Sequence, residues 1–159
     1  MKILVIDDHP LIVRALAQLL PHMDPAIEVR GAVDPAEAVA VLDNEPDVAL
    51  VLLDLALPGA RGLDFLGDLK LDYPGVPIVV LSATHDQATV MAALGAGAHG
   101  FVPKTADPSA LLDAIRRVLE GGVYLMPDTT PMSAANAIRK PGARPMSAPR
   151  ISVRGTPPP

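Results

Sequence analysis

Short apolar runs alternate with longer amphipathic stretches along residues 1–125, and this alternation limits the folds open to the chain. The runs lie at residues 2–6, 27–33, 48–53, 76–81 and 99–102. Runs such as 48–53 and 76–81 lack a polar alternation, which is typical of strands covered on both faces. Five strands that alternate with five helices pack as a parallel sheet joined by right-handed crossovers. We therefore expect an α/β fold, a doubly wound five-stranded parallel sheet with helices on both faces.

Prolines and acidic residues mark where the helices begin. Pro10 suits the first position of a helix, where no backbone hydrogen bond is lost. The segment DPAE at 34–37 combines a capping aspartate, a first-turn proline and an acidic residue three places on. A last helix is predicted to begin at Asp107-Pro108 and to end at Gly121-Gly122. The pattern predicts one folded domain over residues 1–125.

The composition excludes several classes of protein. Half of the residues are hydrophobic, so a buried core can form, and cysteine is absent, which excludes disulfides and thiolate chemistry. The first apolar run is broken at once by two aspartates, so we interpret it as neither a signal peptide nor a membrane anchor. No apolar run approaches the ~20 residues needed to span a bilayer. We expect a soluble, cytoplasmic protein with no membrane partner.

Charge and proline content divide the chain near residue 126. Residues 1–125 hold 8 Lys+Arg against 17 Asp+Glu, a net charge of −9, whereas residues 126–159 hold 5 against 1, a net charge of +4. An acidic folded part argues against direct nucleic-acid binding. The segment 126–159 carries eight prolines and little to bury, so we predict a proline-rich flexible linker or tail.

Polar residues that can perform chemistry follow the ends of four predicted strands. Asp7 and Asp8 follow the first strand, Asp54 ends the third, Ser82 follows the fourth and Lys104 comes just after the fifth. Ligands of such sheets bind beyond the carboxyl ends of the strands. We therefore expect residues nearly 100 positions apart in the chain to meet at one edge of the sheet.

The residue types in this group favour a hard divalent cation and a phosphoryl group. Three carboxylates brought together repel one another, and a bound cation reverses that repulsion. Oxygen ligands favour Mg²⁺, with Mn²⁺ as a substitute, whereas the four histidines show no zinc-ligand spacing and His9 is interpreted as local polarity. A carboxylate can attack phosphorus to form an aspartyl phosphate, and a lysine and a hydroxyl can stabilise the phosphoryl oxygens.

Each of these residues also has an ordinary structural interpretation. Asp8 could cap the following helix, Asp54 could support the turn ahead of Leu57, Ser82 could be a satisfied loop hydroxyl, and Lys104 could be solvated. Each of the four strand ends carries a residue type that phosphoryl chemistry needs. This joint arrangement favours the functional interpretation over coincidence.

Four segments resemble the motifs of response-regulator receiver domains, in the form found in NarL/FixJ (LuxR)-type two-component regulators. The segments are VIDDHPL at 5–11, LLDLALPG at 52–59, VLSA at 80–83 and AGAHGFVPK at 96–104. The resemblance covers residues 1–125. It implies the flavodoxin-like (CheY-like) strand order 2-1-3-4-5, which the apolar pattern alone does not give.

The resemblance also implies a role for each matching residue. Asp54 is the phosphoacceptor, and Lys104 contacts the phosphoryl group. Ser82 is the switch hydroxyl and Phe101 the aromatic switch, which rotates inward in response; many receivers have tyrosine at this position. The implied Mg²⁺ ligands are Asp7 (largely through water), Asp8, Asp54 and the backbone carbonyl of Ala56.

The partners that the resemblance implies are a sensor histidine kinase and a second copy of the chain, bound on phosphorylation. In the full-length regulators of this type a helix-turn-helix output domain controls transcription. No such segment occurs in this sequence, so we expect DNA binding only through an output domain that this chain lacks. The implied protein is a self-phosphorylating phosphoacceptor and weak autophosphatase rather than a turnover enzyme.

Two other functions are weighed against the phosphorylation switch. A pseudo-receiver that acts as an interaction module without phosphate is expected to lack acidic residues or the lysine, and both are present. A phosphatase of the haloacid-dehalogenase type needs a second aspartate two places after its nucleophile. His9 follows Asp7 at that distance and Ala56 follows Asp54, so that pattern fails.

Overall fold

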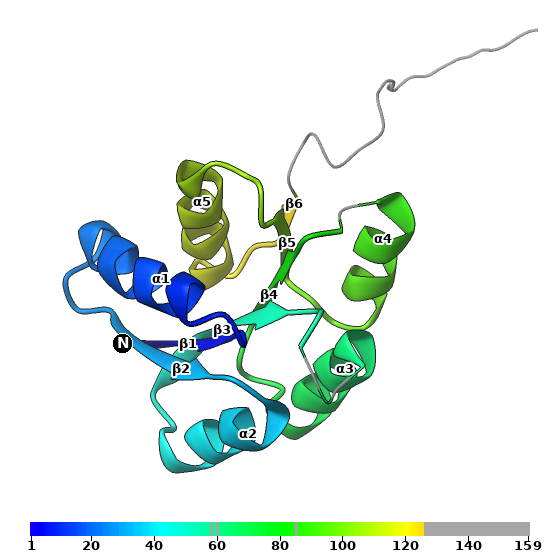
Figure 1. The fold of residues 1–159 in the computed structure, drawn as a ribbon, viewed down its shortest axis with the longest axis horizontal. Helices are drawn as coiled ribbons and strands as arrows, with labels where there is room; N and C mark the ends of the chain where they lie inside the picture. Colours follow the sequence, from blue (N-terminus) through cyan, green and yellow to red (C-terminus); the bar gives the residue numbers. More distant parts are fainter. Residues whose placement is uncertain (58, 60, 85, 126–159) are drawn as a thin grey trace, which may run out of the picture. The chain divides into compact units, whose positions relative to one another are not determined.

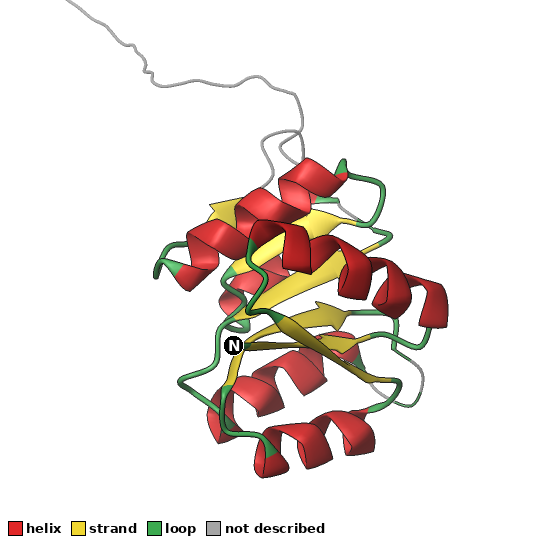
Figure 2. Ribbon diagram, turned by 90° about the vertical axis from the view of Figure 1, so that its left-hand side faces the viewer, coloured by secondary structure: helices red, strands yellow, loops and turns green. Residues whose placement is uncertain are grey.

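A computed structural model describes residues 1–57, 59, 61–84 and 86–125. Over residues 1–125 it shows a central sheet between two layers of helices (Figures 1 and 2). The described residues form six strands and five helices, in alternation up to the last strand. The strands are β1 (Lys2–Ile6), β2 (Glu28–Ala32), β3 (Val48–Asp54), β4 (Ile78–Ser82), β5 (Gly100–Pro103) and β6 (Tyr124–Leu125). The helices are α1 (Pro10–Met23), α2 (Pro35–Asn44), α3 (Gly62–Asp72), α4 (Gln87–Gly95) and α5 (Pro108–Leu119).

The sheet is parallel throughout, in the order β2-β1-β3-β4-β5-β6. The predicted doubly wound fold and the order 2-1-3-4-5 are confirmed. The predicted number of five strands is wrong, because β6 adds a sixth strand at the edge of β5. The pairs are Gly100 with Tyr124 and Phe101 with Leu125. The Tyr124 amide also donates to the carbonyl of His99 at 2.9 Å, which anchors this short strand.

Alternate residues of each central strand enter two separate hydrophobic cores. In β1, Leu4 and Ile6 face one core, whereas Ile3 and Val5 face the other. The first core is covered by α2, α3 and α4, and the second by α1 and α5, on the two sides of the sheet (Figure 1). Burial on both faces explains why these strands read as continuous apolar runs.

The local signals in the sequence fix the helix ends. Helix α1 begins at Pro10 and α2 at Pro35, where Asp34 accepts a hydrogen bond from the amide of Glu37 at 2.8 Å. Helix α5 ends as expected, since Gly121 adopts a φ of +93° and its amide bonds back to Val118. The apolar run 76–81 begins two residues before β4, because Pro77 has no amide hydrogen to give to the ladder.

The predicted linker at 126–159 lies outside the described residues, so its flexibility stays a prediction. Within the part of the chain that the structure describes, no helix is both long enough and apolar enough to cross a bilayer.

Two leucines of α3 test the assignment of its buried face. Leu66 is completely buried in the core under α3, whereas the side chain of Leu71 is 80% exposed. We expect Leu66→Ala to lower the free energy of unfolding by about 3 kcal/mol, because the truncation leaves a cavity. Leu71→Ala should change it by less than about 0.5 kcal/mol. Urea unfolding of both variants measures this difference, and equal effects would contradict the packing of α3.

Candidate functional site

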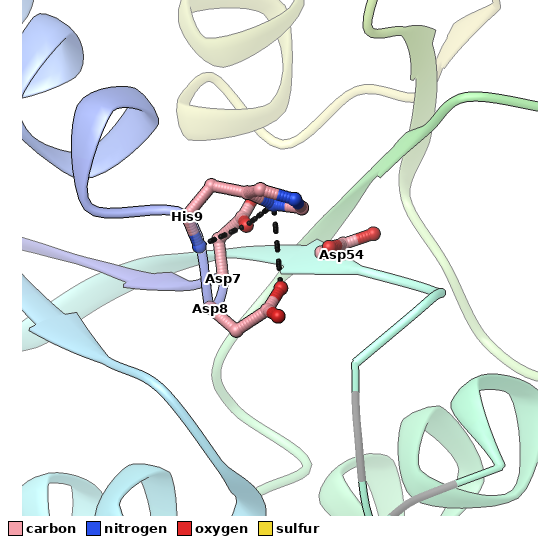
Figure 3. A group of neighbouring side chains, drawn as sticks. All are labelled: Asp7, Asp8, His9 and Asp54. Carbon is pink, nitrogen blue, oxygen red and sulfur yellow. Dashed lines mark hydrogen bonds and ion pairs between the residues drawn. The ribbon is translucent and has the colours of Figure 1, made fainter.

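Two buried aspartates lie side by side at the carboxyl edge of the sheet. Asp7 directly follows β1, and Asp54 is the last residue of β3, the strand paired with β1. Their side chains are about 1% exposed. Because β1 and β3 are parallel neighbours, both carboxylates emerge at the same edge. Figure 3 shows them together with Asp8 and His9.

Lys104 supplies the positive charge between the two buried carboxylates. Its Nζ lies 3.1 Å from Asp7 Oδ2 and 3.1 Å from Asp54 Oδ2. The lysine follows β5 directly, and its backbone amide donates to the carbonyl of Ser82 at 2.8 Å. The loop after β5 is therefore tied to the end of β4. The interpretation of Lys104 as a solvated surface residue is wrong.

His9 holds the second oxygen of Asp7. Its backbone amide donates to Asp7 Oδ1 at 2.9 Å, and its ring Nδ1 lies 2.7 Å from the same oxygen. Nδ1 also lies 3.3 Å from Asp8 Oδ1 (Figure 3). The imidazole therefore stands between the carboxylates of the acidic pair. Only a local polar role was predicted for His9 from the sequence, although its place directly after Asp7-Asp8 was the available signal.

The charges of the site shift three pKa values. Burial acts to raise the pKa of Asp7, but the hydrogen bonds from His9 and the ion pair with Lys104 outweigh it and bring the pKa below its usual value. Burial acts to lower the pKa of Lys104, but Asp54 and Asp7 raise it overall. The hydrogen bond to Asp7 raises the pKa of His9, and the charges of Asp7 and Asp8 add to that effect. Asp7 and Lys104 are therefore both charged at neutral pH.

The donor set fits a divalent cation. Within the described residues, Asp7 Oδ2, Asp8 Oδ1 and Asp54 Oδ2 are buried without a hydrogen-bond partner, although Lys104 contacts two of them as an ion pair. One ligand atom each from Asp7, Asp8, His9 and Asp54 lies within 4.8 Å of the others. Buried oxygens without hydrogen bonds are costly unless an ion or water satisfies them. Carboxylate oxygens are the ligands that Mg²⁺ prefers.

The remaining predicted residues lie around this group. The Ala56 amide donates to Asp54 Oδ1 at 2.9 Å, so Asp54 also supports the turn that follows it. Ser82 is the last residue of β4, and its hydroxyl accepts a hydrogen bond from the Thr84 amide at 3.1 Å. Phe101 is completely buried in the core under α2, α3 and α4. Its ring thus occupies an inward position.

An open groove adjoins the loop that follows β3. It lies between the segment after β3 and the segment after β4, and its lining includes Leu55, Ala56, Arg61, Ser82 and Thr84. Leu55 and Ala56, the two residues after Asp54, place one side of this groove next to the end of β3.

The model of the response regulator receiver domain family matches residues 3–116. Among curated proteins, the chain is 39% identical over 127 residues to the glycerol metabolism activator of Pseudomonas putida, covering 80% of this chain and 58% of that protein. It is 37% identical over 120 residues to the nitrate/nitrite response regulator protein NarP of Escherichia coli (strain K12), covering 76% and 55% respectively. The chain thus spans little more than half the length of these relatives.

A solved structure agrees with these matches. A two-component response regulator of the LuxR family from Aurantimonas sp. SI85-9A1 superposes with a TM-score of 0.74 at 29% sequence identity. The superposition covers 80% of this chain and 91% of the other.

Replacing Lys104 tests whether it compensates the buried carboxylates. Without divalent ions, we expect Lys104→Met to lower the free energy of unfolding at neutral pH by about 3 kcal/mol, because Asp7 and Asp54 lose their cation. The folded pKa of Asp7 is depressed, so its stabilising contribution is present above the unfolded value of 3.8 and lost as the pH falls further. The deficit of the variant should therefore shrink below about pH 4.

The control is Lys70→Met, because the Lys70 ammonium donates to the carbonyls of Pro74 and Val76 rather than to a carboxylate. Its deficit should not shrink over the same acidic range. Thermal midpoints between neutral and acidic pH measure both variants, and a deficit of Lys104→Met that is independent of pH would rule out this electrostatic role.

Proposed function

This chain belongs to the response regulator receiver family, of the NarL/LuxR type, and we propose that its Asp54 accepts a phosphoryl group from a sensor histidine kinase. The observation that carries the proposal is the placement of the Lys104 ammonium, 3.1 Å from both Asp7 and Asp54. Phosphoryl transfer to an aspartate needs a carboxylate nucleophile, a positive charge beside it and carboxylates that can hold a metal ion. Asp54, Lys104 and the pair Asp7 and Asp8 fit these three requirements.

In the proposed reaction a carboxylate oxygen of Asp54 attacks the phosphorus of a phosphohistidine. The oxygen–phosphorus bond forms as the nitrogen–phosphorus bond breaks, and the departing imidazole nitrogen keeps the electron pair and takes a proton. The Ala56 amide holds Oδ1 of Asp54, so the carboxylate is oriented before the donor arrives. The open groove beside Ala56 and Ser82 gives the donor a path to this edge.

The ligands proposed for Mg²⁺, or Mn²⁺ in its place, are Asp7, Asp8, Asp54 and the carbonyl of Ala56, with Asp7 acting largely through water. The support for this assignment is the set of buried carboxylate oxygens that have no hydrogen bond. When bound, the cation neutralises the carboxylates and the negative charge of the incoming phosphoryl oxygens.

Lys104 and Ser82 are proposed to bind the phosphoryl group and to move in response to it. Lys104 contacts Asp54 through its ammonium and the end of β4 through its amide, so a phosphoryl group on Asp54 offers the ammonium a new partner. The Ser82 hydroxyl is proposed to exchange its bond with the Thr84 amide for one to a phosphoryl oxygen. Phe101 belongs to β5, where it pairs with Val80 of β4 three residues before Lys104, and its inward position is proposed to accompany that shift.

The cellular effect of the proposed switch depends on parts of the protein other than the site around Asp54. The chain spans little more than half the length of its curated relatives. We therefore propose control of transcription only for a full-length protein in which a DNA-binding output domain accompanies this receiver domain. We also propose a cytoplasmic location, dimerisation with a second copy on phosphorylation, and a slow autophosphatase reaction rather than turnover.

A pseudo-receiver that signals without phosphate is the second candidate. The observation in its favour is that Phe101 is completely buried, which is the inward position that the resemblance assigns to the switched state. The intact set of Asp7, Asp54 and Lys104 argues for the phosphorylated switch instead.

The phosphoacceptor assignment is tested with acetyl phosphate and Mg²⁺. The full chain should gain one phosphoryl group by intact mass, and Asp54→Asn should gain none, because the amide is not a nucleophile. The control is Asp72→Asn, since Asp72 is the exposed last residue of helix α3 and lies outside the groove lining, so it should leave the gain unchanged. A phosphoryl group on Asp54→Asn would reject this residue, and no gain in any form would favour the pseudo-receiver.

The switch role of Ser82 has a different readout. Ser82→Ala should still be phosphorylated, but the amide chemical shifts of the loop after β4 should respond to beryllofluoride much less than in the parent protein, because the hydroxyl donor is lost. Ser82→Thr keeps the hydroxyl and should restore the response. A full response in Ser82→Ala would contradict the role of this hydroxyl.

A further inference from the structure

The imidazole of His9 has an unusual position for a residue at the start of a helix. His9 occupies the N-cap of α1, yet its side chain makes no capping hydrogen bond to the described residues. Its Nδ1 is directed instead toward Asp7 Oδ1 at 2.7 Å and Asp8 Oδ1 at 3.3 Å (Figure 3). The His9 side chain therefore does not cap helix α1, and its ring faces the carboxylates of Asp7 and Asp8 instead.

The distances within the group match those between ligands of a single ion. Ligands opposite each other across an ion of this size are about 4.2 Å apart, and adjacent ones about 3 Å. One ligand atom each from Asp7, Asp8, His9 and Asp54 lies within 4.8 Å of the others, and Nδ1 of His9 is 2.7 Å from Asp7 Oδ1 and 3.3 Å from Asp8 Oδ1. The bound of 4.8 Å is about 0.6 Å above the distance between opposite ligands.

The backbone keeps His9 in this place. Its amide donates to Asp7 Oδ1 at 2.9 Å, which fixes the segment between β1 and α1 on the carboxylate itself. Pro10 begins the helix directly after it, so the conformation of the segment is further restricted. The imidazole thus needs little rearrangement to exchange its contact with Asp7 for a contact with a cation.

We propose that His9 is a nitrogen ligand of the divalent cation, and that it shifts the preference of the site from Mg²⁺ toward first-row transition ions such as Mn²⁺. This inference rests on the cation site of the proposed function and adds a ligand to it. Mg²⁺ takes oxygen ligands and gives up its water reluctantly, whereas transition ions accept imidazole. The histidines show no zinc-ligand spacing in the sequence, but His9 lies at the site because it directly follows Asp7 and Asp8.

Pulsed electron paramagnetic resonance of bound Mn²⁺ gives a direct test. The full chain is loaded with Mn²⁺ at about pH 8, where a neutral imidazole is available as a ligand. We expect modulation of the echo by a directly bound ¹⁴N nucleus in the parent protein. This modulation should disappear in His9→Gln, which keeps the backbone amide and a polar side chain but has no imidazole.

Affinities provide the second measurement. His9→Gln should weaken Mn²⁺ binding by about tenfold and change Mg²⁺ binding by less than about twofold, as measured by calorimetric titration with each metal alone. The matched control is His22→Gln, because His22 is an exposed histidine in the last turn of the same helix, about 20 Å away. It should change neither affinity.

The outcomes separate this inference from the proposed function. If Mn²⁺ binds without a nitrogen signal, or His9→Gln weakens both metals equally, His9 is not a selective ligand while the cation site stands. If neither metal binds the parent protein, the cation site itself is wrong, and the inference fails with it. Normal circular dichroism of His9→Gln shows that any loss is not due to unfolding.

Discussion

The contact of the Lys104 ammonium with two buried carboxylates is the interaction on which the rest of this molecule depends. Asp7 and Asp54 are nearly inaccessible to water, and each would be costly to bury as an isolated charge. Lys104 pairs with both at 3.1 Å, and His9 binds the free oxygen of Asp7. The site is therefore held together by charges that a cation or a phosphoryl group can redistribute.

The sheet makes this arrangement rigid. Successive residues of β1 and β3 are buried in opposite cores, so neither strand can slide without exposing apolar side chains. Asp54 is paired with Leu81 of β4, and Ser82 with Pro103 of β5, so the residues proposed to react lie in one hydrogen-bonded framework. The same framework continues to the edge of the sheet, where Phe101 pairs with Leu125 of β6.

Much of this fold could be predicted from the sequence, because burial on both faces leaves apolar runs that are easily recognised. The strand order came only from the family resemblance, since each run fits several positions in a parallel sheet. The strand β6 was missed because two residues after Gly121-Gly122 carry no periodicity. The meeting of Asp7, Asp54 and Lys104 followed from the strand ends, whereas the position of His9 depends on a ring orientation that spacing does not reveal.

The carboxylates at this edge are proposed to form a cation site, and the dependence of the thermal midpoint of unfolding on Mg²⁺ concentration reports whether they do. The full chain is titrated with MgCl₂ against NaCl at matched ionic strength. If Asp7, Asp8 and Asp54 form the site, the midpoint rises with Mg²⁺ well beyond the effect of NaCl, since an ion that binds only the folded state stabilises it. Identical curves for the two salts would contradict the account.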